Sequence, residues 1–262
     1  MISLLTVLLL ATSAPTGTAA SPGVAADPLS QTIIQRLGRG LQDPKIGQWV
    51  TYQLKGDDQR GGFMRLAIVG KQKDKVGREA SWLEIEVGQN PNFVAPLFQM
   101  KLLIASKNGL QSDGISRAVV AIGAGQPQEV DPKSLSGRKS KGADEPDQWI
   151  LANEKPINPS KVVARAGKPK LLMTAAGTVD ALPVELVYRS TVFQRYWLSK
   201  EIPVLQLAKI EIPGIENSLE VRDYGLDAKP MIHFPDPNAP KISLEPGAAT
   251  EDGGTDEPAQ AP

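Results

Sequence analysis

Alternation of apolar and polar residues constrains this chain more than any other feature, and it recurs in about nine or ten runs between residues 49 and 224. In residues 49–54 and 82–87, for example, every second residue is Val, Tyr, Leu or Ile. Successive side chains of a strand point to opposite faces, so a period of two predicts strands with one apolar and one polar face. Such half-buried strands are typical of antiparallel sheets.

The connections between these runs favour hairpins. Asn108 and Gly109 lie between the run at 100–107 and the segment from residue 110, and Asn-Gly is typical of two-residue hairpin turns. Strands and helices do not alternate, as they would around a parallel sheet. Many twisted antiparallel strands must curl to hide their apolar face. We therefore predict a mainly β fold, a curved antiparallel sheet or partial barrel of about nine to ten strands with one N-terminal amphipathic helix.

The predicted helix precedes the first strand. Asp27 is a capping residue, Pro28 suits the first helical turn, and Gly38 and Gly40 end the segment. Its apolar residues recur on one face and are Leu29, Ile33, Ile34, Leu37 and Leu41. We expect this face to cover the concave side of the sheet.

The first twenty residues predict export. They contain no charged residue and hold a short apolar run at 4–11, followed by small residues up to Ala20. This pattern is typical of a secretory signal peptide cleaved after Ala20, and the run is shorter than the roughly 20 apolar residues that span a bilayer. An uncleaved membrane anchor and a buried N-terminal helix are the alternatives. We expect a periplasmic or secreted protein.

Prolines divide the remaining chain. Six of them lie between residues 123 and 170 and predict a long loop, because proline lacks the N–H that a strand donates. From residue 235 onward, Pro, Gly and acidic residues predict a disordered tail. The predicted organisation is a signal peptide at 1–20, a linker at 21–27, a single β-rich domain at 28–234 that contains the 123–170 loop, and the acidic tail at 235–262.

The composition excludes several classes of function. The 29 Lys and Arg residues balance 29 Asp and Glu residues, so no overall cationic field attracts nucleic acid, and we expect no nucleic-acid partner. The chain has no Cys and one His. This excludes disulfides, thiolate nucleophiles and metal sites built from several imidazoles. We expect no cofactor and no metal.

Few residue patterns suggest catalysis. His233 lies where the β pattern ends, and we interpret it as a strand-end side chain. Ser136 and Lys139 match a Ser-x-x-Lys spacing, but their Gly-rich, charged surroundings indicate an exposed loop. Glu84 and Glu86 share one strand face and could form an acid–base pair, as in a carboxylate hydrolase, although we interpret them as a solvated strand face. We expect the protein not to be an enzyme.

Short segments spread over residues 45–225 resemble exported bacterial envelope proteins. They are GQWVTY at 47–52, WLEI at 82–85, AGT at 176–178, WLS and IPV within 197–204, and LEVRDYG at 219–225. More distantly, the chain resembles the lipoprotein carriers and related half-barrels of the Gram-negative periplasm. That resemblance implies a curved antiparallel sheet wrapped around helices, with acyl chains held in its concavity. The long proline-rich loop departs from the compact carriers, and no binding residue of that group is matched here.

The leading hypothesis is therefore a non-enzymatic envelope protein that binds a lipid or another apolar ligand on the concave face of the sheet. The candidate lining residues are Ile33, Leu37, Val50, Tyr52, Leu66, Ile68, Leu83 and Ile85. In the alternative interpretation, the same residues form a closed core without a cavity. A second hypothesis is a structural or assembly module that binds an envelope partner through the 123–170 loop and the tail.

Overall fold

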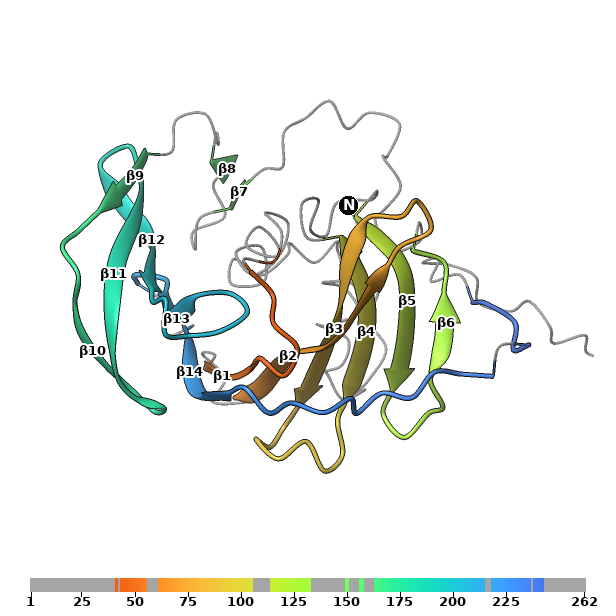
Figure 1. Cartoon of the computed structure of the whole chain (residues 1–262). Helices are drawn as coiled ribbons and strands as arrows, with labels where there is room; N and C mark the ends of the chain where they lie inside the picture. Colours follow the sequence, from red (N-terminus) through yellow and green to blue (C-terminus); the bar gives the residue numbers. More distant parts are fainter. Residues whose placement is uncertain are drawn as a thin grey trace, which may run out of the picture.

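Twelve antiparallel strands form one sheet in the computed structural model of this chain (Figure 1). The structure describes residues 41, 43–55, 61–105, 114–132, 149–150, 156–157, 163–214, 218–236 and 238–242. The strands of the first half are β1 (Trp49–Lys55), β2 (Gly62–Lys73), β3 (Glu79–Gly88), β4 (Phe98–Ala105), β5 (Ile115–Ile122) and β6 (Gln128–Val130). Those of the second half are β9 (Val163–Ala166), β10 (Lys170–Thr174), β11 (Gly177–Tyr188), β12 (Thr191–Leu198), β13 (Leu207–Glu211) and β14 (Ser218–Gly225). A separate pair contains β7 (Trp149–Ile150) and β8 (Pro156–Ile157).

Two meanders joined side by side make up this sheet. The strand order is β10-β11-β12-β13-β14-β1-β2-β3-β4-β5-β6, and β9 pairs with β11 next to β10. The first strand of one meander, β1, pairs with the last strand of the other, β14. Figure 1 shows the sheet bent, with β9–β12 and β3–β6 at opposite ends. The sheet is not closed, so the prediction of a mainly β, curved antiparallel sheet is confirmed.

The strand count differs from the nine to ten that the sequence predicts. The additional strands of the sheet are β6 and β9, which lie in the proline-rich segment at 123–170, and β10, which begins at its last residue. Pro127 and Pro169 stand directly before β6 and β10 and interrupt neither strand. All three strands lie at an end of the sheet, where a proline disturbs the fewest ladder hydrogen bonds.

The bend separates an apolar inner face from an outer face that carries ion pairs and a smaller hydrophobic cluster around Trp82. Val50 lies opposite Leu66, and Leu66 lies opposite Ile85, so these side chains share one face. They belong to a hydrophobic cluster that reaches from Val130 on β6 to Val179 on β11, near the two ends of the sheet. A cluster that joins both ends of a bent sheet lies on the inside of the bend.

The chain continues past β14 as an extended segment along the outer face, seen in blue in Figure 1. We call residues 226–242 the strap. At its end Ile242 forms a parallel bridge with Val130 of β6, and Lys241 forms an ion pair with Glu129. Lys241 and Ile242 of the segment predicted as a tail therefore lie against the sheet.

The predicted signal peptide, the linker and residues 28–40 of the predicted helix lie outside the described residues. Leu41, the last residue of the predicted apolar stripe, is described, and it is buried in the inner cluster. Within the described ranges, no helix is long and apolar enough to cross a membrane.

Candidate functional site

Six of the eight predicted lining residues meet on the inner face of the sheet. Register places Val50 opposite Leu66 and Ile68 opposite Leu83. Each of the six is at most 2% exposed, and all belong to one hydrophobic cluster; they are Val50, Tyr52, Leu66, Ile68, Leu83 and Ile85. The other two, Ile33 and Leu37, lie outside the described residues. That these side chains line a ligand site stays a prediction.

The loop between β12 and β13 adds further apolar side chains to this inner cluster. Ile202, Val204 and Leu205 are buried in it. Val204 has a positive φ of 66°, a strained conformation for a β-branched residue. The Tyr52 hydroxyl donates a buried hydrogen bond of 3.0 Å to the carbonyl oxygen of Leu207, where this loop meets β13. The buried hydroxyl of Tyr52 on this largely apolar face therefore has a hydrogen-bond acceptor.

On the outer face, Glu84 is buried rather than solvated. It lies opposite Lys101 on β4, and Lys101 Nζ is 3.0 Å from Glu84 Oε1. Glu84 is 1% exposed and Lys101 is 4% exposed. The prediction of a solvated strand face was therefore wrong, because it ignored the cation on the neighbouring strand and the strap that covers both residues.

Glu86 is buried by a second polar arrangement on the same face. Arg65 Nη1 donates to Glu86 Oε2 at 2.9 Å, and Gln99 Nε2 donates to Glu86 Oε1 at 2.9 Å. The Arg65 guanidinium also lies 5.5 Å from the centre of the Trp49 ring. Both carboxylates that could have formed an acid–base pair are thus held in ion pairs, Glu86 by Arg65 and Glu84 by Lys101.

The strap is held by the buried Glu84–Lys101 pair. The backbone N–H groups of Met231 and Ile232 donate to the two carboxylate oxygens of Glu84, at 2.9 and 3.2 Å. Lys101 Nζ donates to the carbonyl oxygen of Ile232 at 3.0 Å. Next to these bonds Phe234 packs edge-on against Trp82, with ring centroids 5.1 Å apart. Both members of the ion pair therefore hydrogen-bond the backbone of the strap.

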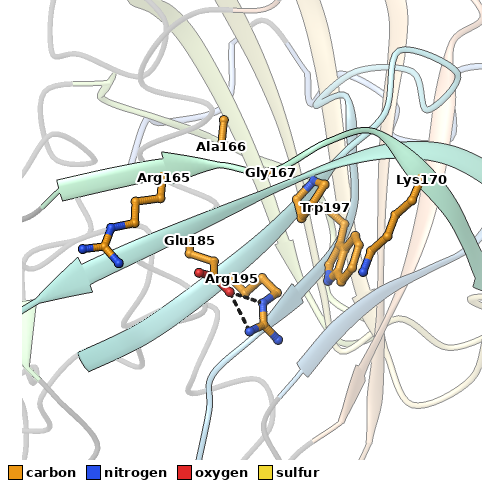
Figure 2. Close-up of a pocket in the computed structure, with 8 residues that line it drawn as sticks. Arg165, Ala166, Gly167, Lys170, Glu185, Arg195 and Trp197 are labelled. Carbon is orange, nitrogen blue, oxygen red and sulfur yellow. Dashed lines mark hydrogen bonds and ion pairs between the residues drawn. The ribbon is translucent and has the colours of Figure 1, made fainter. Parts of the chain in front are cut away.

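A pocket of about 380 Å³ lies where the edge strand breaks between β9 and β10 (Figure 2). Gly167 bridges this break, and its N–H donates to the carbonyl oxygen of Pro183 at 2.9 Å. A Cβ at Gly167 would lie only 2.9 Å from Pro183 Cγ, so glycine allows this close approach. The lining residues are Arg165, Ala166, Gly167, Lys170, Pro183, Glu185, Arg195 and Trp197.

Cations dominate the polar groups of this pocket. Arg195 donates two hydrogen bonds to Glu185 Oε1, at 2.7 and 3.0 Å, and these bonds raise the pKa of the Arg195 guanidinium above its ordinary value. Lys170 Nζ lies 4.7 Å from the centre of the Trp197 ring. No carboxylate among the described residues pairs with Arg165 or Lys170, so the pocket keeps a positive charge.

Sequence reasoning did not find this pocket. The available signal was a run of three cations without an acid between residues 163 and 174, which the proline-rich composition obscured. Of the other residues considered, His233 is exposed in the strap rather than at a strand end, and Ser136 and Lys139 lie outside the described residues. The described ranges hold no cluster of His, Asp and Glu residues that could bind a metal ion.

A second carboxylate on the outer face holds the end of the strap. Arg117 donates two hydrogen bonds to Glu129, at 3.1 and 3.0 Å, and Lys241 Nζ donates a third at 3.0 Å. The hydrogen bonding of Arg117 is the largest influence and lowers the pKa of the Glu129 carboxyl below its ordinary value. This carboxylate therefore links β5, β6 and the strap.

No family model and no curated protein matches this chain. Among solved structures, it is similar to a Bacteroides fragilis protein that is assigned as exported and has a YmcC-like fold. The sequence identity is 6% and the TM-score is 0.34, and the match covers 71% of this chain and 99% of that chain. It is also similar to a chain of the Pseudomonas aeruginosa MucA/MucB complex, at 12% identity and a TM-score of 0.31, covering 77% of this chain and 56% of that one.

A third similar structure is an outer-membrane lipoprotein-sorting domain from Vibrio parahaemolyticus, at 11% identity and a TM-score of 0.26, covering 76% of this chain and 93% of that one. This chain spans little more than half the length of the chain matched in the MucA/MucB complex.

Proposed function

We propose that this protein is an exported, non-enzymatic envelope protein that binds an apolar ligand, such as an acyl chain, against the inner face of its curved sheet. One observation carries the proposal: a continuous apolar face runs from β1–β5 to β12–β14 on the inside of an open bend. Burial of each CH₂ group of an acyl chain there is favourable by about 0.8 kcal/mol.

Two properties of the inner face support this role. Met64 and Met100 are fully buried within it, and unbranched thioether side chains adapt to ligands of irregular shape. The two ends of the sheet share no ladder hydrogen bonds, so they can separate without breaking strand pairing. The face can therefore widen to admit a chain-like molecule.

The outer face supports a structural role for the charged residues. Glu84 and Glu86 each sit within 3.0 Å of a cation, and Glu84 also holds the strap. A carboxylate buried in such an ion pair already has its hydrogen-bond partners within the protein. For this reason we propose a binding protein rather than a hydrolase that uses Glu84 and Glu86.

Native mass spectrometry of the protein, purified from its own envelope, tests the proposal. We expect masses raised by one bound lipid, which disappear after extraction with organic solvent. A fluorescent fatty acid, cis-parinaric acid, should then bind to the extracted protein. A single unliganded mass before and after extraction, together with no binding of the fatty acid, would show that the inner face is a closed core.

Two alanines of β5 provide a matched pair of variants. Ala118 lies on the inner face, opposite Leu102, whereas Ala121 lies opposite Gln99 on the outer face, and both are buried. We expect Ala118→Leu to weaken binding of cis-parinaric acid about tenfold because it fills inner volume. Ala121→Leu should change the affinity by less than about twofold. Equal effects of the two variants would contradict a ligand on the inner face.

A further inference from the structure

Among the described residues, one edge of the sheet has no further strand paired to it. β9 and β10 follow each other along the same side of β11 and both pair with it. Together they form the end strand of the sheet, at the far left of Figure 1. Leu171 is 75% exposed and Met173 is 83% exposed. An exposed edge strand that carries apolar side chains is a template for the addition of a further strand.

The register shows which backbone groups of β10 face outward. A two-residue turn joins β10 to β11, and Thr174 and Gly177 form the pair that closes it. Hydrogen-bonded and non-hydrogen-bonded pairs alternate along an antiparallel ladder from that closing pair. Leu171 and Met173 therefore occupy non-hydrogen-bonded positions and present their N–H and C=O groups to the open edge. Within the described part of the chain, neither residue has a hydrogen-bond partner on that side.

The charge of this edge selects its partner. Residues 163–174 contain Arg165, Lys168 and Lys170 and no acidic residue. Arg165 and Lys170 stand on either side of the break between β9 and β10 and line its pocket. Figure 2 shows these two side chains with Arg195 and Trp197. Carboxylates of an added strand would meet these cations, whereas a second copy of the same edge would bring like charges together.

We infer that β10 binds an acidic, extended peptide segment of a partner protein as an additional strand. The backbone of the peptide pairs with Leu171 and Met173, its apolar side chains pack on the side chains of these two residues, and its carboxylates reach Arg165 and Lys170. This interaction is independent of the apolar ligand proposed for the inner face. The opposite edge differs, because the strap already pairs with β6 there.

Titration of the ¹⁵N-labelled full chain with a peptide of about eight residues, alternating Glu and Val, tests this inference. We expect the amide signals of Leu171 and Met173 to shift on binding. Peptides in which Lys replaces Glu, or in which alternate backbone nitrogens are methylated, should bind at least about tenfold more weakly. Unchanged signals of Leu171 and Met173, or equal binding of the Lys peptide, would overturn the inference.

Two variants separate the contributions of backbone and charge. Leu171→Pro removes an outward N–H and leaves the β10–β11 ladder intact, and it should weaken binding at least about tenfold. Arg165→Glu with Lys170→Glu should do the same. The matched control, Lys71→Glu with Lys73→Glu, makes the same charge change at exposed positions of β2 and should alter the affinity less than about twofold.

Two other occupants of the edge give distinct results. A dimer of the full chain that Leu171→Pro abolishes, measured by analytical ultracentrifugation, would assign the edge to a second copy. Peptide binding that is seen only after removal of residues 243–262 would assign it to the acidic tail of the chain itself. Either result would overturn the assignment to a partner protein, and neither bears on ligand binding at the inner face.

Discussion

Glu84 and Lys101 face each other across β3 and β4 as a buried ion pair of 3.0 Å, and both also hydrogen-bond the backbone of Ile232. Residues far apart in the sequence thus share one polar site under the strap. Burial of this site removes water that would otherwise solvate each charge. The stability of this site therefore depends on each of these polar groups keeping its partner.

Removal of one charge from this pair should destabilise the protein strongly. Glu84→Gln leaves the buried Lys101 ammonium without a counter-charge, and we expect a loss of about 3 kcal/mol in the free energy of unfolding. Urea denaturation followed by tryptophan fluorescence measures this loss. The double variant Glu84→Gln with Lys101→Met should recover part of it, because the unpaired charge is then gone. An unchanged midpoint for the single variant would contradict the buried ion pair.

The strap should loosen when its aromatic contact is removed. Phe234→Ala removes the edge-on contact with Trp82, at 5.1 Å between centroids, and should cost about 1 kcal/mol. Faster hydrogen–deuterium exchange at Met231 and Ile232 would report the loosening, because their N–H groups are bonded to Glu84. Met231→Ala is the control, since the Met231 side chain is exposed, and it should leave the exchange at Ile232 nearly unchanged.

A glycine before β1 should not tolerate a side chain. Gly47 has a φ of +93°, and a Cβ there would lie 2.2 Å from the carbonyl oxygen of Leu226. Gly77 has a similar φ of +82° with nothing within 4 Å, so Gly77→Ala isolates the backbone strain, at about 1 kcal/mol. We expect Gly47→Ala to cost about 2 kcal/mol more, because the start of the strap must move. Thermal unfolding of both variants makes the comparison, and equal losses would argue against the close approach.

Acid should weaken the attachment of the end of the strap. The pKa of Glu129 is lowered in the folded state, chiefly by hydrogen bonds from Arg117, so its stabilising effect is present above the ordinary pKa of 4.5 and is lost as the pH falls through the lowered value. Wild type should therefore be more stable than Glu129→Gln at neutral pH, and the difference should shrink in strong acid. Thermal melting of both proteins across this pH range measures it. A difference that does not vary with pH would contradict this role of Glu129.

Local pattern was sufficient to predict the strands with one apolar face. The run at 49–54 lies within β1, and the run at 82–87 lies within β3. The predicted turn at Asn108 and Gly109 lies outside the described residues, so that hairpin stays a prediction. The same alternation placed Val50, Leu66 and Ile85 on one face, as the register shows. These features follow from the period of two, which is a property of neighbouring residues and needs no knowledge of distant contacts.

Distant contacts decided the features that the pattern missed. Glu84 alternates with apolar residues and looks solvent-facing, yet its burial depends on Lys101 and on a strap almost 150 residues further along the chain. Likewise, β9 and β10 are short and flanked by proline, and they become strands only because β11 offers them a paired edge.

By itself, the sequence determined a mainly β chain with a curved antiparallel sheet and one apolar face, since strand periodicity is encoded locally. Only the tertiary structure decided which charges are buried, which strands close the ends of the sheet and where Arg165 and Lys170 meet in a pocket. Ion pairing and edge pairing depend on which segments come together in space, and spacing along the chain does not specify this.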